Sequence, residues 1–372
     1  MPARIPTFAS RIVAWQRRHG RHDLPWQRTR DPYRIWVSEI MLQQTQVATA
    51  IPYFERFVAR FPDVATLAAA SSDDVMRLWS GLGYYARARN LHRAAQAVVE
   101  RHEGRVPLSL EGLVALPGVG RSTAAAIVSL STGRPLAILD ANVKRVLARQ
   151  FGVEGAVDAA PVLRRLWELA DSLVPGRAVE PYTQGLMDLG ATVCARAKPA
   201  CAACPVRGTC VAFREGRTDS LPGRKAARAS PERRIAVFAI VSRGAVLVQK
   251  RPPSGIWGGL WSLPEAPHDS EPQAWVAKRF GLRVDAVDAL APFTHVFTHF
   301  RLDITPWLVR VSGGRKRATI LEAAWLPMAQ VRDAALPAPV KKLLVRALPA
   351  ARPGDSARAG TGAGSRGARP GR

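Results

Sequence analysis

All four cysteines of the 372-residue chain lie in one short window with the spacing C-x6-C-x2-C-x5-C: Cys194, Cys201, Cys204 and Cys210. Four thiolates so close in sequence can surround a single ion or cluster, so the spacing predicts a metal site. Disulfide bonds are the alternative, but the start of the chain has no apolar run typical of a signal peptide, which favours a reducing compartment. Zinc and a 4Fe–4S cluster both accept four cysteines. Only one C-x2-C pair is present, and the wider outer spacings favour the 4Fe–4S cluster over zinc.

The chain carries 54 Lys and Arg residues against 29 Asp and Glu residues, a formal net charge of +25. Such an excess attracts polyanions, and nucleic acid is the leading candidate because much of the excess lies in sequence with a folded pattern. Arg and Ala are abundant throughout and a basic tail inflates the count, so charge alone favours nucleic acid only slightly. No stretch approaches the roughly 20 uninterrupted apolar residues of a membrane-spanning helix, so we expect no membrane partner.

The hydrophobic period changes once along the chain, which predicts two domains. From residue 8 to about 193, apolar residues recur at spacings of three and four, as in helices. The period then becomes two, and we expect strands at Ile235–Val241, Ala245–Gln249 and Phe300–Ile304. An α-domain followed by a smaller α+β domain fits this change. The expected boundaries are a helical domain at 1–213 with the metal loop at 194–210, a linker at 214–234, an α+β domain at 235–348 and a disordered basic tail at 349–372.

A glycine turn opens a helix in the middle of the first domain. Leu116-Pro-Gly-Val-Gly120 precedes an alanine-rich helical stretch, and the pattern from Val114 to Gln150 predicts helix, tight turn, helix, short loop, helix. The two glycines permit close backbone approach, and the helix start offers unpaired N–H groups, so the turn suits a phosphate. Any helical hairpin has a similar pattern, but the following Leu139-Asp140-Ala-Asn142-Val-Lys144-Arg145 makes this one more specific.

With this hairpin, an acidic residue about twenty positions later and four closing cysteines, the chain resembles the endonuclease III superfamily of DNA glycosylases. Within it the chain is similar to adenine glycosylases of the MutY type. The motifs that carry the resemblance are Leu24-Pro-Trp26, Trp36–Val47, Gly81–Asn90 and Met187–Ala191. The match runs from about residue 8 to 213 and, more weakly, to about 347. It implies a mostly α N-terminal helix-hairpin-helix glycosylase domain with an iron–sulfur loop, followed by a smaller α+β Nudix-like domain.

The resemblance also implies roles for two carboxylates. Breaking an N-glycosidic bond needs a proton for the leaving base and stabilisation of an oxocarbenium ion. By the resemblance, Glu39 is the general acid that protonates adenine, at N7, and later activates water. Asp140 faces the sugar and stabilises the cation. The alternatives are a solvated helix carboxylate for Glu39 and an N-cap of the helix beginning near Val143 for Asp140, and Asp140 can cap and catalyse at once.

Further positions follow from the same resemblance. The target nucleotide must leave the base stack before it can react. The adenine pocket is expected to contain Leu24, Trp26, Val47, Ser122 and Gln184. The residues expected to contact DNA are Gln43, Gln44, Thr45, Tyr84, Gly118, Val119, Gly120, Asn142, Lys144, Phe297, Thr298 and His299. For Tyr84 and the glutamines, a core aromatic and a helix surface are the alternatives.

Position 122 bears on whether the enzyme also cuts the DNA backbone. Members of the superfamily that do so carry, two residues after the second hairpin glycine, a lysine that forms a Schiff base. Ser122 stands at that position here, and a hydroxyl cannot form an imine. We therefore expect a monofunctional glycosylase that leaves an intact abasic site, with Lys144 contacting phosphate.

The second domain resembles the Nudix fold, but part of its metal motif is missing. Gly259 and Glu265 preserve the opening G-x5-E, whereas the magnesium-binding carboxylates expected near residues 273–278 are replaced by Gln-Ala-Trp-Val-Ala-Lys. Nucleoside diphosphate hydrolysis is therefore not expected. By the resemblance, the domain senses 8-oxoguanine opposite the adenine, through Phe297-Thr298-His299 where the family commonly has Phe-Ser-His.

The leading hypothesis is excision of adenine mispaired with 8-oxoguanine or guanine in double-stranded DNA, by a monomeric, cytoplasmic, nucleoid-associated protein of bacterial type. The first rival is an endonuclease III-like glycosylase and lyase, which Ser122 disfavours. The second is a non-catalytic iron–sulfur protein that senses DNA damage, which the two carboxylates disfavour. The third is a Nudix hydrolase fused to a DNA-binding module.

Overall fold

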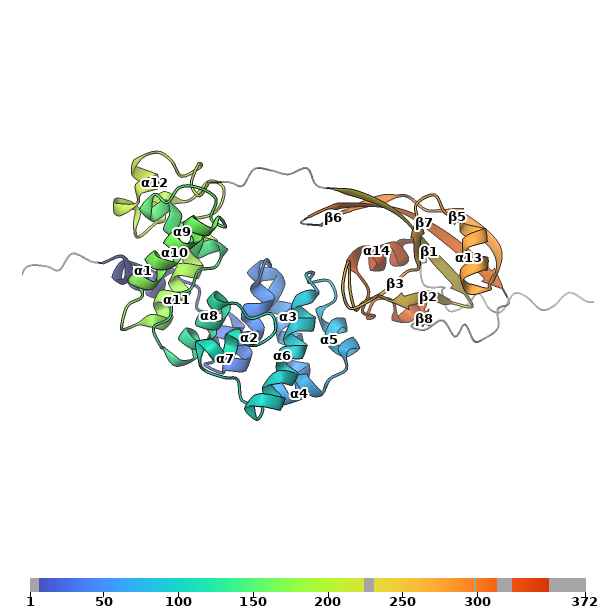
Figure 1. The fold of residues 1–372 in the computed structure, drawn as a ribbon, viewed down its shortest axis with the longest axis horizontal. Helices are drawn as coiled ribbons and strands as arrows, with labels where there is room; N and C mark the ends of the chain where they lie inside the picture. Colours follow the sequence, from blue (N-terminus) through green and yellow to red (C-terminus); the bar gives the residue numbers. More distant parts are fainter. Residues whose placement is uncertain (1–6, 224–230, 298, 313–322, 348–372) are drawn as a thin grey trace, which may run out of the picture. The chain divides into compact units, whose positions relative to one another are not determined.

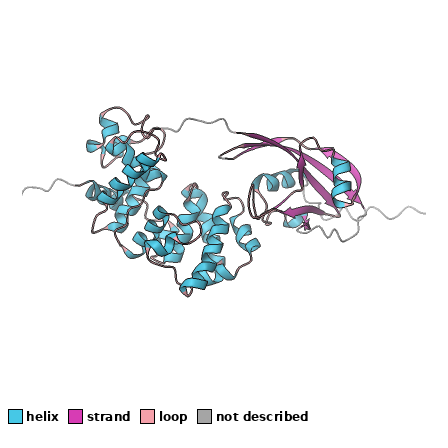
Figure 2. Cartoon of the chain, in the orientation of Figure 1, coloured by secondary structure: helices cyan, strands magenta, loops and turns pink. Residues whose placement is uncertain are grey.

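The computed structural model describes residues 7–223, 231–297, 299–312 and 323–347. The chain divides into two compact units, Met1–Arg228 and Ala229–Arg372 (Figure 1). The first unit is helical and the second is built on a sheet (Figure 2), so the expected change from a helical to an α+β pattern is confirmed. Among the described residues, no helix has both the length and the apolar character needed to cross a membrane.

The first unit consists of helices joined by short loops. Its α-helices are α1 (Phe8–His19), α2 (Pro32–Leu42), α3 (Val47–Arg60), α4 (Val64–Ala69), α5 (Ser72–Trp79), α6 (Ala86–His102), α7 (Leu110–Val114), α8 (Arg121–Thr132), α9 (Ala141–Phe151), α10 (Ala160–Leu173), α11 (Val179–Asp188) and α12 (Val211–Arg214). Shorter helical turns are η1 (Pro25–Arg28), η2 (Leu189–Val193), η3 (Cys201–Ala203) and η4 (Arg207–Thr209).

Side-chain caps explain where several of these helices begin. Ser71 Oγ accepts a hydrogen bond of 3.1 Å from Asp74 N at the start of α5, and Asp63 accepts one of 2.7 Å from Thr66 N at the start of α4. These bonds satisfy N–H groups that the first helical turn leaves unpaired. The expected hairpin is also present, because α7, a glycine turn, α8, a loop and α9 follow one another.

The helices form two groups, one of α2 to α8 and one of α1 with α9 to α11 (Figure 1). In the group α2 to α8, Phe57 contacts Phe61 and Trp79 with ring centroids 5.0 and 5.8 Å apart. In the group made by α1 and α9 to α11, fully buried residues such as Ile12, Leu147 and Leu166 form the core. Helix α11 contacts α1, α8 and α9, so it joins the two groups.

The second unit is a mixed sheet flanked by helices. Its elements are β1 (Glu232–Ser242), β2 (Ala245–Lys250), β3 (Trp261–Ser262), β4 (Glu265–Pro267), α13 (Pro272–Phe280), β5 (Arg283–Ala289), β6 (Phe293–Val296), β7 (Arg301–Ser312), β8 (Ala323–Pro327), η5 (Met328–Gln330) and α14 (Ala338–Ala347). The strand order is β3-β2-β1-β7-β5, with β4 on β1, β6 on β7 and β8 on β2. Strands β1 and β7 are parallel and pair from Glu232 with Arg301 to Val241 with Arg310.

The segment expected as a linker, 214–234, is partly structured at both ends. Leu221 is 3% exposed, its carbonyl accepts a hydrogen bond of 2.9 Å from Arg149 Nε, and Gly223 forms a bridge with Ala156. The sequence suggested a linker because this stretch is polar and basic, but the buried Leu221, the bond from Arg149 and the bridge at Gly223 attach its first part to the helical unit. Strand β1 also starts at Glu232, inside the expected segment.

Candidate active site

One cavity in the helical unit, of about 880 Å³, brings together most of the residues predicted for the active site. Its lining comes from the loop around η1, from α2 and the loop after it, and from α8, α9 and α11. The predicted residues that line it are Leu24, Trp26, Glu39, Gln43, Gln44, Thr45, Val47, Ser122, Asp140, Asn142 and Gln184. Residues that lie far apart in the sequence therefore face a common space that is large enough for a nucleotide.

Glu39 lies on α2 among buried residues and faces the cavity. Burial raises the pKa of its carboxyl from 4.5 to about 8, and the negative charge of Asp140 adds to the rise. Loss of hydration disfavours the charged form of a carboxyl, and a second carboxylate nearby disfavours it further. Glu39 therefore holds a proton near neutral pH, as a general acid must.

Asp140 is the N-cap of α9, which is the alternative to a purely catalytic role that the sequence analysis gave for this residue. Its Oδ1 accepts a hydrogen bond of 2.7 Å from Val143 N. Burial raises the pKa of Asp140, while hydrogen bonds from the backbone of Val143 and Asn142 and the charges of Arg145 and Lys144 oppose that rise. Burial outweighs these effects, so the pKa of Asp140 lies above its usual value, and the N–H groups and the positive end of the helix limit the rise.

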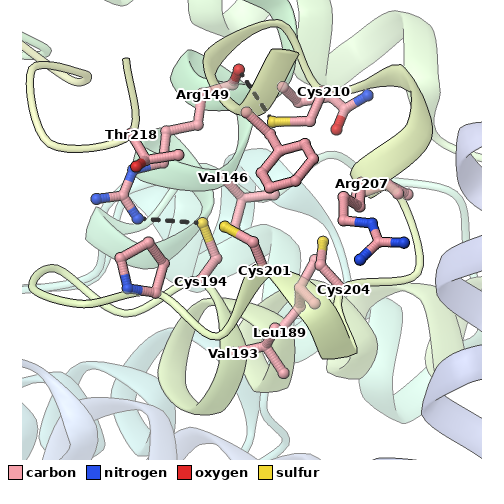
Figure 3. Close-up of a pocket in the computed structure, with 14 residues that line it drawn as sticks. Val146, Arg149, Leu189, Val193, Cys194, Cys201, Cys204, Arg207, Cys210 and Thr218 are labelled. Carbon is pink, nitrogen blue, oxygen red and sulfur yellow. Dashed lines mark hydrogen bonds between the residues drawn. The ribbon is translucent and has the colours of Figure 1, made fainter. Parts of the chain in front are cut away.

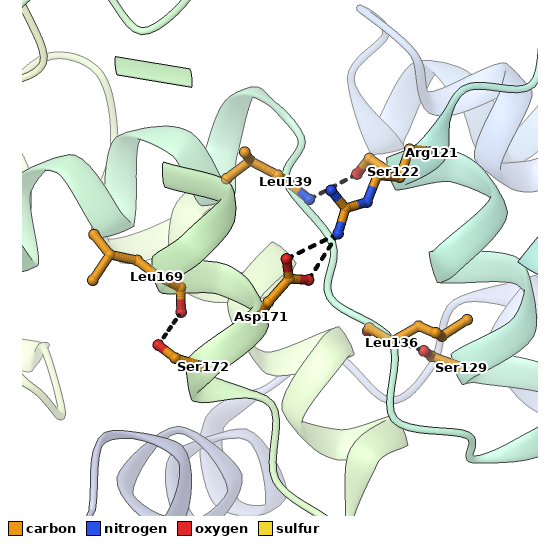
Figure 4. Close-up of polar contacts among 8 residues, drawn as sticks. All are labelled: Arg121, Ser122, Ser129, Leu136, Leu139, Leu169, Asp171 and Ser172. Atoms are coloured by element: carbon orange, nitrogen blue, oxygen red, sulfur yellow. Dashed lines mark hydrogen bonds and ion pairs between the residues drawn. The ribbon is translucent and has the colours of Figure 1, made fainter. Parts of the chain in front are cut away.

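Ser122 helps to hold the chain that leads to Asp140. Its Oγ accepts a hydrogen bond of 2.9 Å from Leu139 N, one residue before Asp140 (Figure 4). The neighbouring Arg121 makes two bonds of 2.9 Å to the carboxylate of Asp171 on α10, and its guanidinium lies 3.8 Å from the centroid of the Trp167 ring. The start of α8 is therefore attached both to the segment before α9 and to α10.

The glycine turn has fewer unpaired backbone N–H groups than its sequence suggested. Val119 is buried and its N–H donates to Leu116 O at 3.2 Å, so this group is not a free donor. Gly118 has a φ of +78° and a Cβ there would lie 2.7 Å from Asn90 Cβ, which explains the glycine. At Gly120, a Cβ would meet nothing within 4 Å, and no described side chain caps the first turn of α8. That turn keeps N–H groups available for an anion.

Two further predicted DNA contacts lie outside the cavity. Lys144 forms an ion pair of 2.7 Å with Asp158, so its ammonium already has a partner in the described structure. Tyr84 is 43% exposed and has a φ of 48°. Its ring therefore belongs to the surface, and the alternative of a core aromatic is wrong.

A buried carboxylate that the sequence analysis did not single out orients Gln184. Asp188 is fully buried, and its Oδ1 accepts a hydrogen bond of 2.9 Å from Gln184 Nε2. Asp188 Oδ1 also pairs at 2.6 Å with Arg21, another cavity residue, and Oδ2 accepts from Arg21 N at 3.0 Å. The amide nitrogen of Gln184 is thus engaged, which leaves Oε1 as the acceptor for a ligand. The position of Asp188 in the motif Met187–Ala191 was the only signal in the sequence.

The four cysteines line one small apolar cavity of about 30 Å³ (Figure 3). Arg149 lies beside it, 2% exposed, and its Nη1 donates to Cys194 Sγ at 3.4 Å. Among the described residues, no group of three or more Cys, His, Asp or Glu is arranged so that it could hold a metal ion. The four sulfurs surround an apolar cavity beside the buried guanidinium of Arg149.

Arg145 links the cysteine loop to the start of α9. Its Nε donates to Cys194 O at 2.7 Å, while Nη2 donates to Asn142 Oδ1 at 2.9 Å and to Gly190 O at 2.6 Å. Gly190 is needed here because a Cβ would lie 2.6 Å from Asn142 Cβ. The loop therefore braces the helix that begins at Asp140.

In the second unit, the predicted contact loop follows strand β6. The Phe297 ring stacks on Phe300 with centroids 4.5 Å apart and lies 5.7 Å from the ring of Trp257. His299 is exposed, and Thr298 lies outside the described residues. Glu265, the remaining Nudix-motif carboxylate, receives bonds of 2.6 and 3.0 Å from Arg251, so both of its oxygens are engaged.

Comparison with known proteins assigns each unit to a known domain family. Residues 37–172 match a model described as "HhH-GPD superfamily base excision DNA repair protein", and residues 236–346 match a NUDIX domain. The chain is 36% identical to an adenine DNA glycosylase of Buchnera aphidicola from Acyrthosiphon pisum, over 91% of this chain and 96% of that protein. It is 31% identical to human adenine DNA glycosylase, over 92% and 74%. A solved thermostable thymine-DNA glycosylase is 33% identical with a TM-score of 0.51, covering 56% of this chain and 95% of that one.

The helical fold and its cavity thus define a DNA glycosylase of the helix-hairpin-helix superfamily, a hydrolase of N-glycosyl bonds. Within that class, the chain belongs to the adenine DNA glycosylase family, because relatives with more than 30% identity match it across both units. The expected fold class, a helix-hairpin-helix domain followed by a Nudix-like domain, is confirmed.

The raised pKa of Glu39 predicts a gain in stability when the residue is made neutral. Between pH 4.5 and about 8 the folded protein keeps the proton that the unfolded chain has released, so the free energy of unfolding falls as pH rises through this window. Glu39→Gln lacks that titration. We expect the free energy of unfolding of this variant to exceed that of the wild type by about 1–3 kcal/mol at about pH 8 and by far less at about pH 5. Urea unfolding of both proteins at both pH values measures the difference; equal stabilities at the higher pH would contradict it.

Proposed function

We propose that this enzyme removes adenine mispaired with 8-oxoguanine or guanine from double-stranded DNA. The observation that carries the proposal is the cavity that Glu39 and Asp140 share, in which burial keeps Glu39 protonated near neutral pH. An extruded nucleotide in this cavity meets an acid for its base and a carboxylate for its sugar. The adenine DNA glycosylases to which the chain is related support adenine as the base that is removed.

The chemistry follows from the two environments. Glu39 transfers its proton to adenine N7, the bond between the base and C1′ breaks, and the bonding electrons leave with the neutral base. The resulting oxocarbenium ion is stabilised by the Asp140 carboxylate, whose charge the N–H group of Val143 supports. Glu39, now ionised, takes a proton from water as the water oxygen bonds to C1′.

Recognition of adenine is assigned to the walls of the same cavity. Gln184 is fixed through Nε2, so its Oε1 accepts a hydrogen bond from the exocyclic amine of adenine. The buried side chains of Leu24 and Trp26, together with Val47, supply an apolar surface for the base. The Trp26 ring is held edge-on against Phe54 at 5.3 Å, which fixes this wall.

Contacts with the duplex extend the site beyond the cavity. The first turn of α8 after Gly118–Gly120 binds a phosphate through its N–H groups, and Asn142 and Lys144 reach the backbone nearby. Gln43–Thr45 and Tyr84 enter the opened duplex where the nucleotide has left. Phe297, Thr298 and His299 of the second unit contact 8-oxoguanine and recognise it. The protein acts as a monomer at the nucleoid.

The cysteine loop is proposed to hold a 4Fe–4S cluster. Cys194, Cys201, Cys204 and Cys210 are its ligands, and the buried Arg149 offsets its negative charge. Bound there, the cluster cross-links the loop to the rest of the helical unit. The domain boundaries proposed are a glycosylase domain at 1–213 with its cluster loop at 194–210, a linker at 214–234, a recognition domain at 235–348 and a basic tail at 349–372.

Base release from a panel of duplexes tests the substrate. In single-turnover reactions, we expect adenine release when adenine is opposite 8-oxoguanine or guanine, and far less opposite cytosine or thymine. Asp140→Asn should lower the rate constant by about a thousandfold or more and still bind the duplex, because the N-cap bond remains possible. Release of an oxidised pyrimidine instead, or unchanged release by the Asp140→Asn variant, would refute the proposal.

Borohydride trapping tests the absence of a lyase step. Ser122 cannot form an imine with the sugar aldehyde, so the product should be an intact abasic site. We expect little covalent enzyme–DNA adduct on treatment with borohydride, measured against a bifunctional superfamily member as the positive control. An adduct yield equal to that of the control would restore the lyase alternative.

Elemental analysis tests the cluster. The purified protein should contain about four iron atoms and four acid-labile sulfides per chain, and Cys204→Ser should lose both and unfold at lower temperature. One zinc ion per chain with no sulfide would overturn the cluster assignment.

A further inference from the structure

One buried arginine joins the two loops that are proposed to enter the opened duplex. Arg87 lies in the first turn of α6 and is 8% exposed. Its Nη1 donates to Ile40 O at 3.0 Å, to Met41 O at 2.7 Å and to Gln43 O at 2.5 Å, all at the end of α2. Its Nη2 donates to Gly83 O at 3.1 Å, in the loop between α5 and α6. A single planar guanidinium therefore spans both loops.

The bonds fall on the peptide units that determine how each loop points. Gln43 O belongs to the peptide before Gln44, whose φ is 56°, and Gly83 O belongs to the peptide before Tyr84, whose φ is 48°. Residues other than glycine occupy this left-handed region only when their surroundings impose it. Arg87 supplies a hydrogen bond at each of the two points where the backbone is strained.

The charge of Arg87 is accommodated by main-chain oxygens. Burial lowers the pKa of its guanidinium to about 10, so the group remains protonated near neutral pH. Carbonyls at the C-terminal end of α2 carry the negative end of the helix dipole and lack partners within the helix. The guanidinium also lies 5.4 Å from the centroids of the Tyr84 and Trp79 rings, which places it against the side chain that Tyr84 presents to solvent.

We propose that Arg87 is a positioning residue that fixes the Gln43–Thr45 loop and the Gly81–Tyr84 loop as one rigid wedge for opening the duplex. The inference rests on the proposed function, because it takes Gln44 and Tyr84 as the residues that enter the DNA. Since both loops bind the same guanidinium, its loss releases them together. The loss should therefore affect extrusion of the nucleotide more than cleavage of a nucleotide that is already unpaired.

The test compares two variants with a matched control on two substrates. Arg87→Gln removes the positive charge and the planar guanidinium. Arg87→Lys keeps the positive charge, but its single ammonium cannot donate from two nitrogens in one plane, which is the geometry that joins the loops. Arg93→Gln is the control, because Arg93 is an exposed residue of the same helix that bonds only locally to Asn90 Oδ1 at 2.7 Å. One duplex carries adenine opposite 8-oxoguanine, and the other carries adenine opposite a stable abasic site, where the base is already unpaired. A 2-aminopurine beside the adenine reports unstacking.

We expect both Arg87 variants to lose about tenfold or more in single-turnover rate on the paired duplex and no more than about threefold on the pre-opened one. The 2-aminopurine signal should fall in parallel, and Arg93→Gln should match the wild type in both measurements. Circular dichroism and thermal unfolding establish that each variant is folded; if Arg87→Gln does not fold, Arg87→Lys alone decides the result.

Two outcomes would overturn the inference while leaving the proposed function intact. Equal losses on both substrates would indicate general damage to the active site, and full unstacking by Arg87→Lys would show that no bridge between the loops is needed. If instead the wild type releases no adenine from either duplex, the proposed function fails and this inference fails with it. The reactions of the wild type therefore distinguish a failure of this inference from a failure of the proposed function.

Discussion

Hydrogen bonds from buried or half-buried guanidinium groups to main-chain carbonyls hold the loops of the helical unit in place. Arg87 binds carbonyls at the end of α2 and before Tyr84, Arg145 binds those of Gly190 and Cys194, and Arg149 binds those of Ala195 and Leu221. A carbonyl at a helix end or in a loop has no partner in a helix ladder, and a guanidinium offers five donors in one plane. Each arginine can thus join a helix to loop carbonyls that lack a partner in a helix ladder.

The same helices place two carboxyl groups in different environments within one cavity. Glu39 lies among apolar neighbours, and burial raises its pKa to about 8. Asp140 is also desolvated, but the N–H of Val143 donates to it at 2.7 Å, which favours its charged form. The surroundings of the two carboxyl groups therefore differ, because the backbone N–H groups at the start of α9 oppose the effect of burial on the pKa of Asp140. The burial of the Glu39 carboxyl lowers the stability of the folded protein, and the fold tolerates this cost at a functional position.

What the sequence could predict depended on whether the interaction was local. The Asp140 cap of α9 was anticipated because a side chain and an N–H group three residues on form it, and the strand starting near Ile235 followed from a period of two. The bonds from Arg21 to Asp188 join positions 167 residues apart, so no spacing rule announces them. The hydrogen bond from Val119 N to Leu116 O is local, but no side-chain pattern in the sequence predicts it, because it joins two main-chain groups within the same turn.

The second unit shows how a metal-binding fold can keep its architecture without the metal carboxylates. On α13, where those carboxylates were expected, Trp275 stacks on Phe238 of β1 with centroids 4.7 Å apart and contacts Phe280 at 5.6 Å. Aromatic packing of this kind stabilises a helix on a sheet without any ion. The remaining motif carboxylate, Glu265, forms an ion pair with Arg251. In this unit, aromatic packing thus holds the motif helix on the sheet, and an ion pair engages the remaining motif carboxylate.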